Sequence, residues 1–294
     1  MLKFSKLSVD ATVDTAVANF GGAMEADTIS KHGQSLKSQM SRENILRRAS
    51  VFLLVAAMFA GCSKDDTRKV KSITATPTSI SIFYDEKSEI KMAHFPLSAK
   101  EPVYTFVSDD EYVAAVDNAG KVSGRHVGEC IIEISTSVGV STQCNVTIKP
   151  RSNLYKEPYL VFGGSVSSVK AYENRSIASE TSTGIVYRGE NSNIRNVVYL
   201  FEGGKMTAAA VLFANTTYCV DEAHKYLSER YDPLGSSGNI IVYQGRGRVI
   251  GFSLDNDLGL NALYIPDTDT KSHTASRFDA VKERLLSIIA NNEQ

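Results

Sequence analysis

Short runs in which apolar and polar residues alternate dominate the chain between residues 70 and 149. Turn residues separate these runs at intervals of about 8 to 12 residues, a spacing typical of a β-sandwich. The alternation is clearest at Ile80 and Ile82 and again at Ile132 and Ile134. Because successive side chains of a strand point to opposite faces, each pair places its apolar side chains on one face. The pattern therefore predicts an all-β sandwich over residues 70–149.

The pattern changes after residues 150–157, a polar segment that we interpret as a linker. Residues 158–270 combine helical spacing with apolar, strand-like runs. Gly203-Gly204 separates two of these runs, and a hairpin turn is expected there. The order of elements predicts an α+β domain with a mostly antiparallel sheet and helices against one sheet face.

Two helices are predicted within this domain. Ser165 is a candidate N-cap for a short helix that reaches Tyr172. Apolar residues between Val220 and Tyr231 recur at helical spacing, and we place Asp221 and Glu222 in the first turn, where the helix dipole favours anions.

A C-terminal amphipathic helix is predicted over residues 274–292. Its apolar stripe includes Phe278 and Leu285, and Ser276 with Asp279 forms a candidate capping pair. Two interpretations stay open for the stripe, which either docks onto the α+β domain or binds a partner.

The α+β domain is interpreted as two weak copies of one unit, residues 159–214 and 218–266. Each copy begins with a helix and continues into a glycine-centred hairpin, so that Phe201-Glu202-Gly203 corresponds to Tyr243-Gln244-Gly245. This order distantly resembles the helix-and-antiparallel-sheet units of the β-lactamase inhibitor protein and of small outer-membrane assembly lipoproteins. The resemblance implies an architecture and no functional residue.

Composition removes several classes of protein. The 294 residues carry 32 basic and 33 acidic side chains, so the broad positive field typical of nucleic-acid binding is missing, and no nucleic-acid partner is expected. The apolar run Val51–Ala60 is half as long as the roughly 20 residues of a membrane-spanning helix. We therefore do not expect an integral membrane protein.

Residues 40–61 have the organisation of a secretory signal. Arg47 and Arg48 precede the apolar run, and the small residues Ala60-Gly61 follow it. The ending Phe59-Ala60-Gly61-Cys62 resembles the lipobox of bacterial lipoproteins, although Phe59 stands where Leu, Val or Ile is usual. The resemblance implies that Cys62 is acylated, with palmitate among its acyl chains, and becomes the mature first residue. The alternative is a short buried helix with an incidental cysteine.

The segments on either side of this signal are interpreted from their position. Residues 1–39 would place the apolar run unusually deep in a precursor, so we interpret them as a non-native extension and Met40 as the start. Residues 62–69 form a tether, in which Ser63-Lys64-Asp65-Asp66 resembles the tag of surface-exposed Bacteroidota lipoproteins. The alternative for this stretch is a plain solvated spacer.

A motif within residues 104–134 resembles the group 2 bacterial immunoglobulin-like domain. It contains Val113-Ala114-Ala115-Val116-Asp117, then Gly120-Lys121-Val122, and later Gly128. Phe106 occupies the place of the usual tryptophan. The resemblance covers residues 70–149 and implies an immunoglobulin-like sandwich that acts as a spacer or adhesive unit in envelope proteins, without catalytic residues.

Cys130 and Cys144 have the same strand parity, and their midpoint, Ser137, lies in a turn-like stretch. Directly opposed residues of antiparallel strands have Cα atoms about 4.5–5.5 Å apart, which a disulfide accepts. We therefore predict a Cys130–Cys144 disulfide, formed after export. Two buried free thiols are the alternative.

The search for catalytic or metal-binding motifs is negative, and no cofactor or metal is expected. The glycine-rich run 245–251 is one residue too long for a dinucleotide loop, and we interpret it as a hairpin turn. The acidic triplets 255–257 and 267–269 offer oxygens to calcium but lack the rest of a calcium-binding loop, so surface turns are the preferred interpretation. Cys219 is interpreted as a small buried hydrophobe, and the dispersed histidines are interpreted as structural: His94, His126, His224 and His273.

Nine of the ten tyrosines in the second half suggest either core packing or a surface cluster that binds glycan or protein: Tyr155, Tyr159, Tyr187, Tyr199, Tyr218, Tyr226, Tyr231, Tyr243 and Tyr264. The sequence favours an outer-membrane, lipid-anchored surface lipoprotein that is not an enzyme. Its partners are the membrane, through the anchor, and a protein or glycan ligand. The alternative functions are a periplasm-facing lipoprotein in envelope assembly and, third, an enzyme with an unrecognised acidic site.

Overall fold

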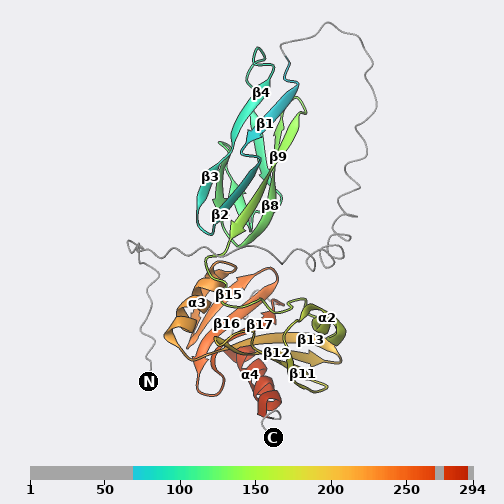
Figure 1. Ribbon diagram of the computed structural model, residues 1–294, viewed down its shortest axis with the longest axis vertical. Helices are drawn as coiled ribbons and strands as arrows, with labels where there is room; N and C mark the ends of the chain where they lie inside the picture. The colour runs from blue at the N-terminus through green and yellow to red at the C-terminus, as the bar shows by residue number, and fades with distance from the viewer. Residues whose placement is uncertain (1–68, 269–274, 291–294) are drawn as a thin grey trace, which may run out of the picture. The chain divides into compact units, whose positions relative to one another are not determined.

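The structure is a computed structural model that describes residues 69–268 and 275–290 (Figure 1). These residues form a mostly β fold with several sheets, and the largest sheet is antiparallel. The predicted extension 1–39, signal 40–61 and lipidation site Cys62 lie outside the described residues, as does the tether up to residue 68. No helix among the described residues combines the length and the apolar character that crossing a membrane requires.

The first part, which we call the β region, comprises residues 70–149. The strands predicted from the alternation are present, and together they enclose one core that contains Ile90, Val122 and Ile132. The strands pair in the orders β2-β9-β8-β5, β3-β7-β6 and β1-β4, and only β2 and β9 run parallel. The strands are β1 (Ser72–Thr76), β2 (Ser79–Phe83), β3 (Lys87–Glu89), β4 (Lys91–Phe95), β5 (Tyr104–Ser108), β6 (Ala114–Val116), β7 (Lys121–Gly124), β8 (Gly128–Thr136) and β9 (Ser141–Lys149).

The predicted disulfide between Cys130 and Cys144 is wrong. In the β8–β9 hairpin Cys130 lies opposite Val146, and Cys144 lies opposite Ile132. The two cysteines are therefore diagonal neighbours, whose Cα atoms are about 7–8 Å apart in a regular sheet. That separation exceeds the range of about 4.4–6.8 Å for a disulfide. Both side chains are buried and both thiols are free, which agrees with the alternative interpretation.

The second part contains one eight-stranded antiparallel sheet in the order β10-β11-β12-β13-β17-β16-β15-β14. Three helices accompany it: α2 (Val166–Tyr172), α3 (Thr217–Ser228) and α4 (Ala275–Ala290). Its strands are β10 (Ile177–Glu180), β11 (Gly184–Arg188), β12 (Ile194–Glu202), β13 (Lys205–Phe213), β14 (Asp232–Ser237), β15 (Ile240–Gly245), β16 (Arg248–Asp255) and β17 (Gly259–Pro266).

Two helix-plus-meander units build this sheet. Helix α2 precedes the meander β10-β11-β12-β13, helix α3 precedes the meander β14-β15-β16-β17, and the last strands of the two meanders pair with each other. The predicted correspondence between the turn at Gly203 and the turn at Gly245 is wrong, because the two turns occupy different positions in their meanders. Gly203-Gly204 joins the third and fourth strands of its meander, whereas the turn at Gly245 joins the second and third strands of the other.

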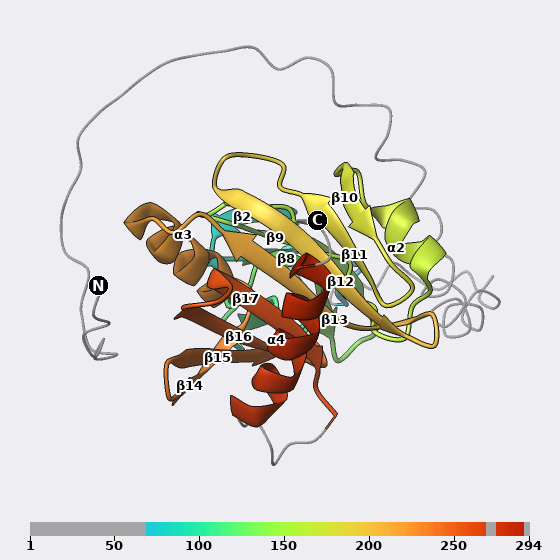
Figure 2. The ribbon, with the colours of Figure 1, turned by 90° about the horizontal axis from the view of Figure 1, so that it is seen from below.

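Both faces of the sheet are buried, which differs from the predicted arrangement with helices on one face. Helices α2 and α3 cover one face, where Val169 and Tyr226 join the core. Helix α4 covers the opposite face and crosses it from β16 to β11 (Figure 2). Its Phe278 ring lies so close to Gly251 that a Cβ there would be 2.7 Å from ring atoms, and Ile288 packs in the same way on Gly184. The predicted docking of the apolar stripe onto the sheet is confirmed.

Helix boundaries agree with the prediction for α2, since Ser165 is its N-cap and accepts a hydrogen bond from the Ser168 amide. Helix α3 begins earlier than predicted, because Thr216 caps it. Asp221 therefore lies beyond the first turn. Helix α4 begins at Ala275, so Ser276 is inside the helix and is not its N-cap.

The segment predicted as a linker packs against the second part. The amides of Arg151 and Ser152 donate to the Glu229 carboxylate at distances of 2.9 to 3.1 Å, and Leu154 and Tyr155 are buried in the core. These contacts fix the position at which the chain enters the eight-stranded sheet region.

The packing of α4 leads to a stability prediction. Phe278→Ala should lower the free energy of unfolding by about 3–5 kcal/mol, because it leaves a cavity above Gly251. Glu283→Ala, on the exposed side of the same helix, should change it by less than about 0.5 kcal/mol. Urea unfolding of both variants checks this, and equal effects would contradict the docking of α4.

Candidate binding pocket beside the C-terminal helix

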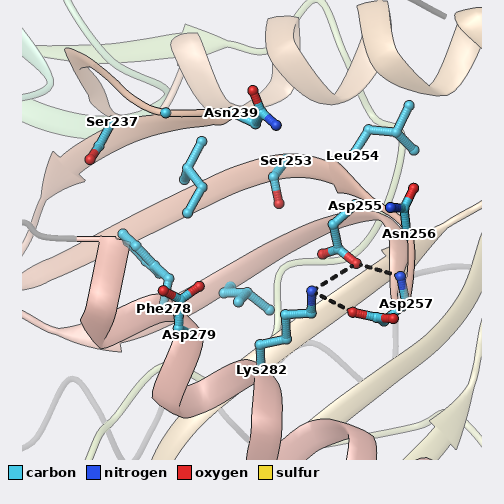
Figure 3. A pocket seen from close by; sticks show the side chains of 13 residues that line it. Ser237, Asn239, Ser253, Leu254, Asp255, Asn256, Asp257, Phe278, Asp279 and Lys282 are labelled. Carbon is cyan, nitrogen blue, oxygen red and sulfur yellow. Dashed lines mark hydrogen bonds and ion pairs between the residues drawn. The ribbon is translucent and has the colours of Figure 1, made fainter.

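A cavity of about 360 Å³ lies where the first half of α4 meets strands β15 to β17 (Figure 3). Leu263 and Phe278 contribute apolar surface to it, and the turns before β15 and after β16 contribute polar groups. The lining residues are Ser237, Gly238, Asn239, Ile240, Ser253, Leu254, Asp255, Asn256, Asp257, Leu263, Phe278, Asp279 and Lys282.

Asp255 organises the turn between β16 and β17. Its Oδ1 accepts hydrogen bonds from the amides of Asp257 and Leu258, at 2.9 and 2.7 Å, and its Oδ2 accepts one from the buried Asn261 side chain at 3.0 Å. An aspartate that bonds backbone amides two and three residues ahead is a common turn-forming arrangement. The acidic triplet 255–257 is thus a turn, as the sequence interpretation preferred.

Lys282 of α4 joins this turn to the helix. Its ammonium lies 3.4 Å from Asp255 Oδ1 and 2.7 Å from Asp257 Oδ2 (Figure 3). The hydrogen bond to Asp257 and the nearby Asp255 raise the pKa of Lys282. The amine therefore stays protonated near neutral pH and is a poor nucleophile or base there.

The lining carries more negative than positive charge. It contains three carboxylates and one ammonium, which gives a formal net charge of −2. The Ser253 hydroxyl donates to Asn261 at 3.4 Å, and no histidine lies among the lining residues to activate it. No group of three or more potential metal ligands occurs within the described residues.

Cys219 and the histidines considered in the sequence analysis do not come together in this pocket. The buried Cys219 thiol points to the carbonyl and side-chain oxygens of Asn193, each 3.7 Å away. Burial lowers the pKa of His224, whose Nδ1 lies 2.5 Å from the Tyr243 hydroxyl.

Neither histidine of the β region lines this pocket. His94 lies 3.3 Å from the Ala99 carbonyl, and His126 stacks on Tyr112 with a ring separation of 3.9 Å. His126 Nε2 also lies 3.3 Å from Asp232. His273 is outside the described residues.

The remaining predicted turns have simple roles. The run 245–251 is the β15–β16 hairpin followed by β16, with Arg246 and Gly247 at positive φ. Asp267 accepts a hydrogen bond from Gln244 at 2.5 Å, and Asp269 lies outside the described residues.

Core packing accounts for most of the tyrosines. Of the nine tyrosines considered above, Tyr218 is exposed and Tyr159 is half-buried, whereas the other seven are buried: Tyr155, Tyr187, Tyr199, Tyr226, Tyr231, Tyr243 and Tyr264. The structure therefore does not place these seven rings on a ligand-binding surface.

A buried ion cluster behind α2 was not anticipated from the sequence. Arg175 donates to Glu173 at 2.6 Å and to Glu190 at 2.7 Å, and the side chains of Arg175 and Glu173 are almost fully buried. The Tyr199 hydroxyl also donates to Glu173. Burial would raise the pKa of Glu190, but hydrogen bonds from Arg175 and the Lys156 amide outweigh it and lower that pKa.

No known protein family matches the chain, and no curated protein matches it. Several solved structures match at low similarity. A crystal structure of an intimin–Tir90 complex is 20% identical over 27% of this chain and 43% of that chain, with a TM-score of 0.20. A crystal structure of an EHEC O157:H7 intimin mutant is 15% identical over 41% and 84%, with a TM-score of 0.20.

Domains 5-6 of the S-layer protein SbsC are 12% identical over 69% of this chain and 86% of that chain, with a TM-score of 0.24. These are distant similarities to bacterial surface proteins. With TM-scores this low they carry no argument about the function of this chain.

The ion cluster leads to a second stability prediction. Arg175→Met should lower the free energy of unfolding by about 3–5 kcal/mol at pH 7, because it leaves the buried Glu173 without its cationic partner. Lys170→Met removes the half-exposed pair with Glu180 and should cost less than about 1 kcal/mol.

The effect of Arg175→Met should depend on pH. A carboxyl whose folded pKa is lowered, such as Glu190, stabilises the fold above its unfolded pKa and loses that contribution as pH falls through the folded value. In the variant, Glu190 no longer receives the hydrogen bonds from Arg175 that lower its pKa, so the difference from wild type should shrink below about pH 4, where the wild-type protein also loses this contribution. Urea unfolding between pH 3 and 7 measures this, and a difference that is constant with pH would contradict it.

Proposed function

We propose that this chain is a lipoprotein of the bacterial outer membrane, anchored through Cys62, on the cell surface. Residues 70–149 form an immunoglobulin-like spacer in this proposal. The eight-stranded sheet region with its helices is the presented part, and it makes non-catalytic contacts with a protein or a glycan.

The observation that carries the proposal is the order of residues before Cys62. The cysteine is preceded first by arginines, then by an apolar decapeptide and then by Ala60-Gly61. This is the order of a lipoprotein signal. An anchor at Cys62 would join the β region after a tether of only a few residues.

The path of the chain through the β region supports a spacer role. Strands β1 and β2 follow each other with only Pro77 and Thr78 between them, and Phe83 at the end of β2 pairs with Lys149 at the end of β9. The chain therefore enters near Ser72 and leaves after Lys149 at the opposite end. A domain whose preceding and following chain segments attach at opposite ends holds those segments apart.

The candidate pocket supports binding more than catalysis. Its one amine is held protonated by two carboxylates, and no histidine lies among the lining residues to activate Ser237 or Ser253. Elsewhere in the second part, the pKa values of Glu190 and Glu222 are lowered. A carboxyl that acts as a general acid near neutral pH needs a shift in the other direction.

Lipidation at Cys62 is tested by labelling cells with radioactive palmitate. The wild-type protein should be labelled, and globomycin should block its processing. Cys62→Ser should lose the label because the acylated thiol is removed. The control Cys219→Ala, which changes a buried thiol, should keep the label. Label that persists in Cys62→Ser, or an unlabelled wild-type protein, would contradict the anchor.

The side of the membrane is tested by adding protease to intact cells. A surface protein should be digested while a periplasmic marker stays whole, because the outer membrane excludes the protease. Protection of the chain until the outer membrane is opened would favour the periplasm-facing alternative.

A further inference from the structure

Four of the most exposed large apolar side chains in the described residues gather at one end of the β region. Phe95, Leu97, Val103 and Val138 have exposed fractions of 62, 84, 77 and 60%. We call this group the apolar tip. Isolated exposed apolar residues are ordinary, but a group of them marks a contact surface.

Strand pairing brings the members of the tip together. Phe95 ends β4, and Val103 directly precedes Tyr104, the first residue of β5. Tyr104 pairs with Thr136, which is the last residue before the turn that carries Val138. The loop 96–103 and the turn 137–140 therefore lie at the same end.

The exposure of Leu97 is maintained by its loop. The Ala99 amide donates to the Pro96 carbonyl at 3.0 Å, and His94 lies 3.3 Å from the Ala99 carbonyl. Ala99 itself is buried. Leu97 therefore lies within a hydrogen-bonded turn whose buried residue is Ala99, and the Leu97 side chain itself is exposed.

The chain enters the β region at this same end. Ser72, the first residue of β1, pairs with Phe95, and the Lys71 amide donates to the Phe95 carbonyl at 2.8 Å. Cys62 precedes Ser72 by ten residues, which span at most about 36 Å when fully extended. Ser72, the partner of Phe95 in the tip, is therefore separated from the proposed anchor residue by no more than that length of chain.

Charge near the tip is suitable for phospholipid headgroups. Lys69, Lys71 and Lys100 are exposed there, against Glu101. Lysines around an apolar group are typical of surfaces that lie at a membrane interface, where the apolar side chains enter the boundary between headgroups and acyl chains.

We propose that the apolar tip inserts into the interface of the bilayer that holds the Cys62 anchor. This inference rests on the proposed function, because the anchor brings the tip to the membrane. Once the anchor is inserted, contact of the tip is an intramolecular event at high effective concentration. The contact restrains the β region at the membrane, so the tip acts as a second, non-covalent attachment.

The experiment uses the absence of tryptophan from the chain. Leu97→Trp introduces a single fluorescent reporter into the full-length, lipidated protein. Tyr218→Trp is the matched control, since Tyr218 is 57% exposed and lies in the first turn of α3. Each variant is reconstituted into vesicles of phosphatidylethanolamine and phosphatidylglycerol, with or without brominated acyl chains. Val103→Trp serves as a second reporter in the same loop.

Leu97→Trp and Val103→Trp should emit at shorter wavelength in vesicles, and brominated chains should quench them at least about twofold more than the control, because these side chains enter the acyl boundary. Equal quenching of reporter and control in vesicle-bound, lipidated protein would overturn the tip contact alone. A blue-shifted reporter without vesicles would also overturn it, since protein would then cover the tip. Intact mass that shows no lipid on Cys62 would overturn the proposed function, and the tip contact with it.

Discussion

The pairing of β13 with β17 is the contact on which the second part of the molecule depends. It joins two meanders that are each only four strands wide into a single eight-stranded sheet. Along β13, Ala209 and Val211 face the core under α2 and α3, and Ala210 and Leu212 face the core under α4. Both cores therefore cross the seam between the two units. Small alanine side chains at this seam allow the covering side chains from both layers to approach the strands closely.

The two cores differ in how they are closed. On one side, each unit contributes its own helix, so α2 and α3 follow directly from the repeated order of elements. On the other side, α4 alone crosses from one unit to the other, and it packs on glycines of both, Gly251 and Gly184. The candidate pocket lies at the start of this helix, where the Asp255 turn and Lys282 hold it to the second unit. The pocket is therefore a consequence of one helix covering a sheet that two units have built.

Alternation predicted the strands of the β region because each has one buried face and one exposed face, as in β8 and β1. It was less useful in the second part, where β12 and β13 are buried on both faces and carry apolar residues without alternation. The prediction of helices on only one sheet face overlooked this burial of both faces. Strand β14 was missed for a different reason, since Pro233 and Gly235 are unfavourable in a strand and are tolerated because β14 is an edge.

The predicted disulfide between Cys130 and Cys144 was wrong because the prediction placed the centre of the β8–β9 hairpin at the wrong residue. A centre at Ser137 opposes the two cysteines, whereas the observed pairing of Ser135 with Ser141 places the centre at Val138 and moves the opposition by two residues. Loop chemistry sets this register more strongly than the parity of the strands does.

The pocket could not be predicted from the sequence, because its two sides come from distant parts of the chain. The 255–257 turn was identified, but its partner Lys282 lies 25 residues further along and across the sheet, and only the docking of α4 unites them.

The distribution of exposed apolar surface connects the two parts. In the second part, the exposed large apolar side chains are spread over separate elements: Val161, Ile177, Tyr218 and Leu234. The β region instead concentrates such side chains at the end where the chain enters. This end also has exposed lysines and the first strand after the tether. The exposed Leu97 side chain adds nothing to the core of the β region. The turn that carries it is already held by the buried Ala99 and by hydrogen bonds. Apolar surface that contributes nothing to folding, yet is held in place by the fold, is best explained by a contact outside the chain.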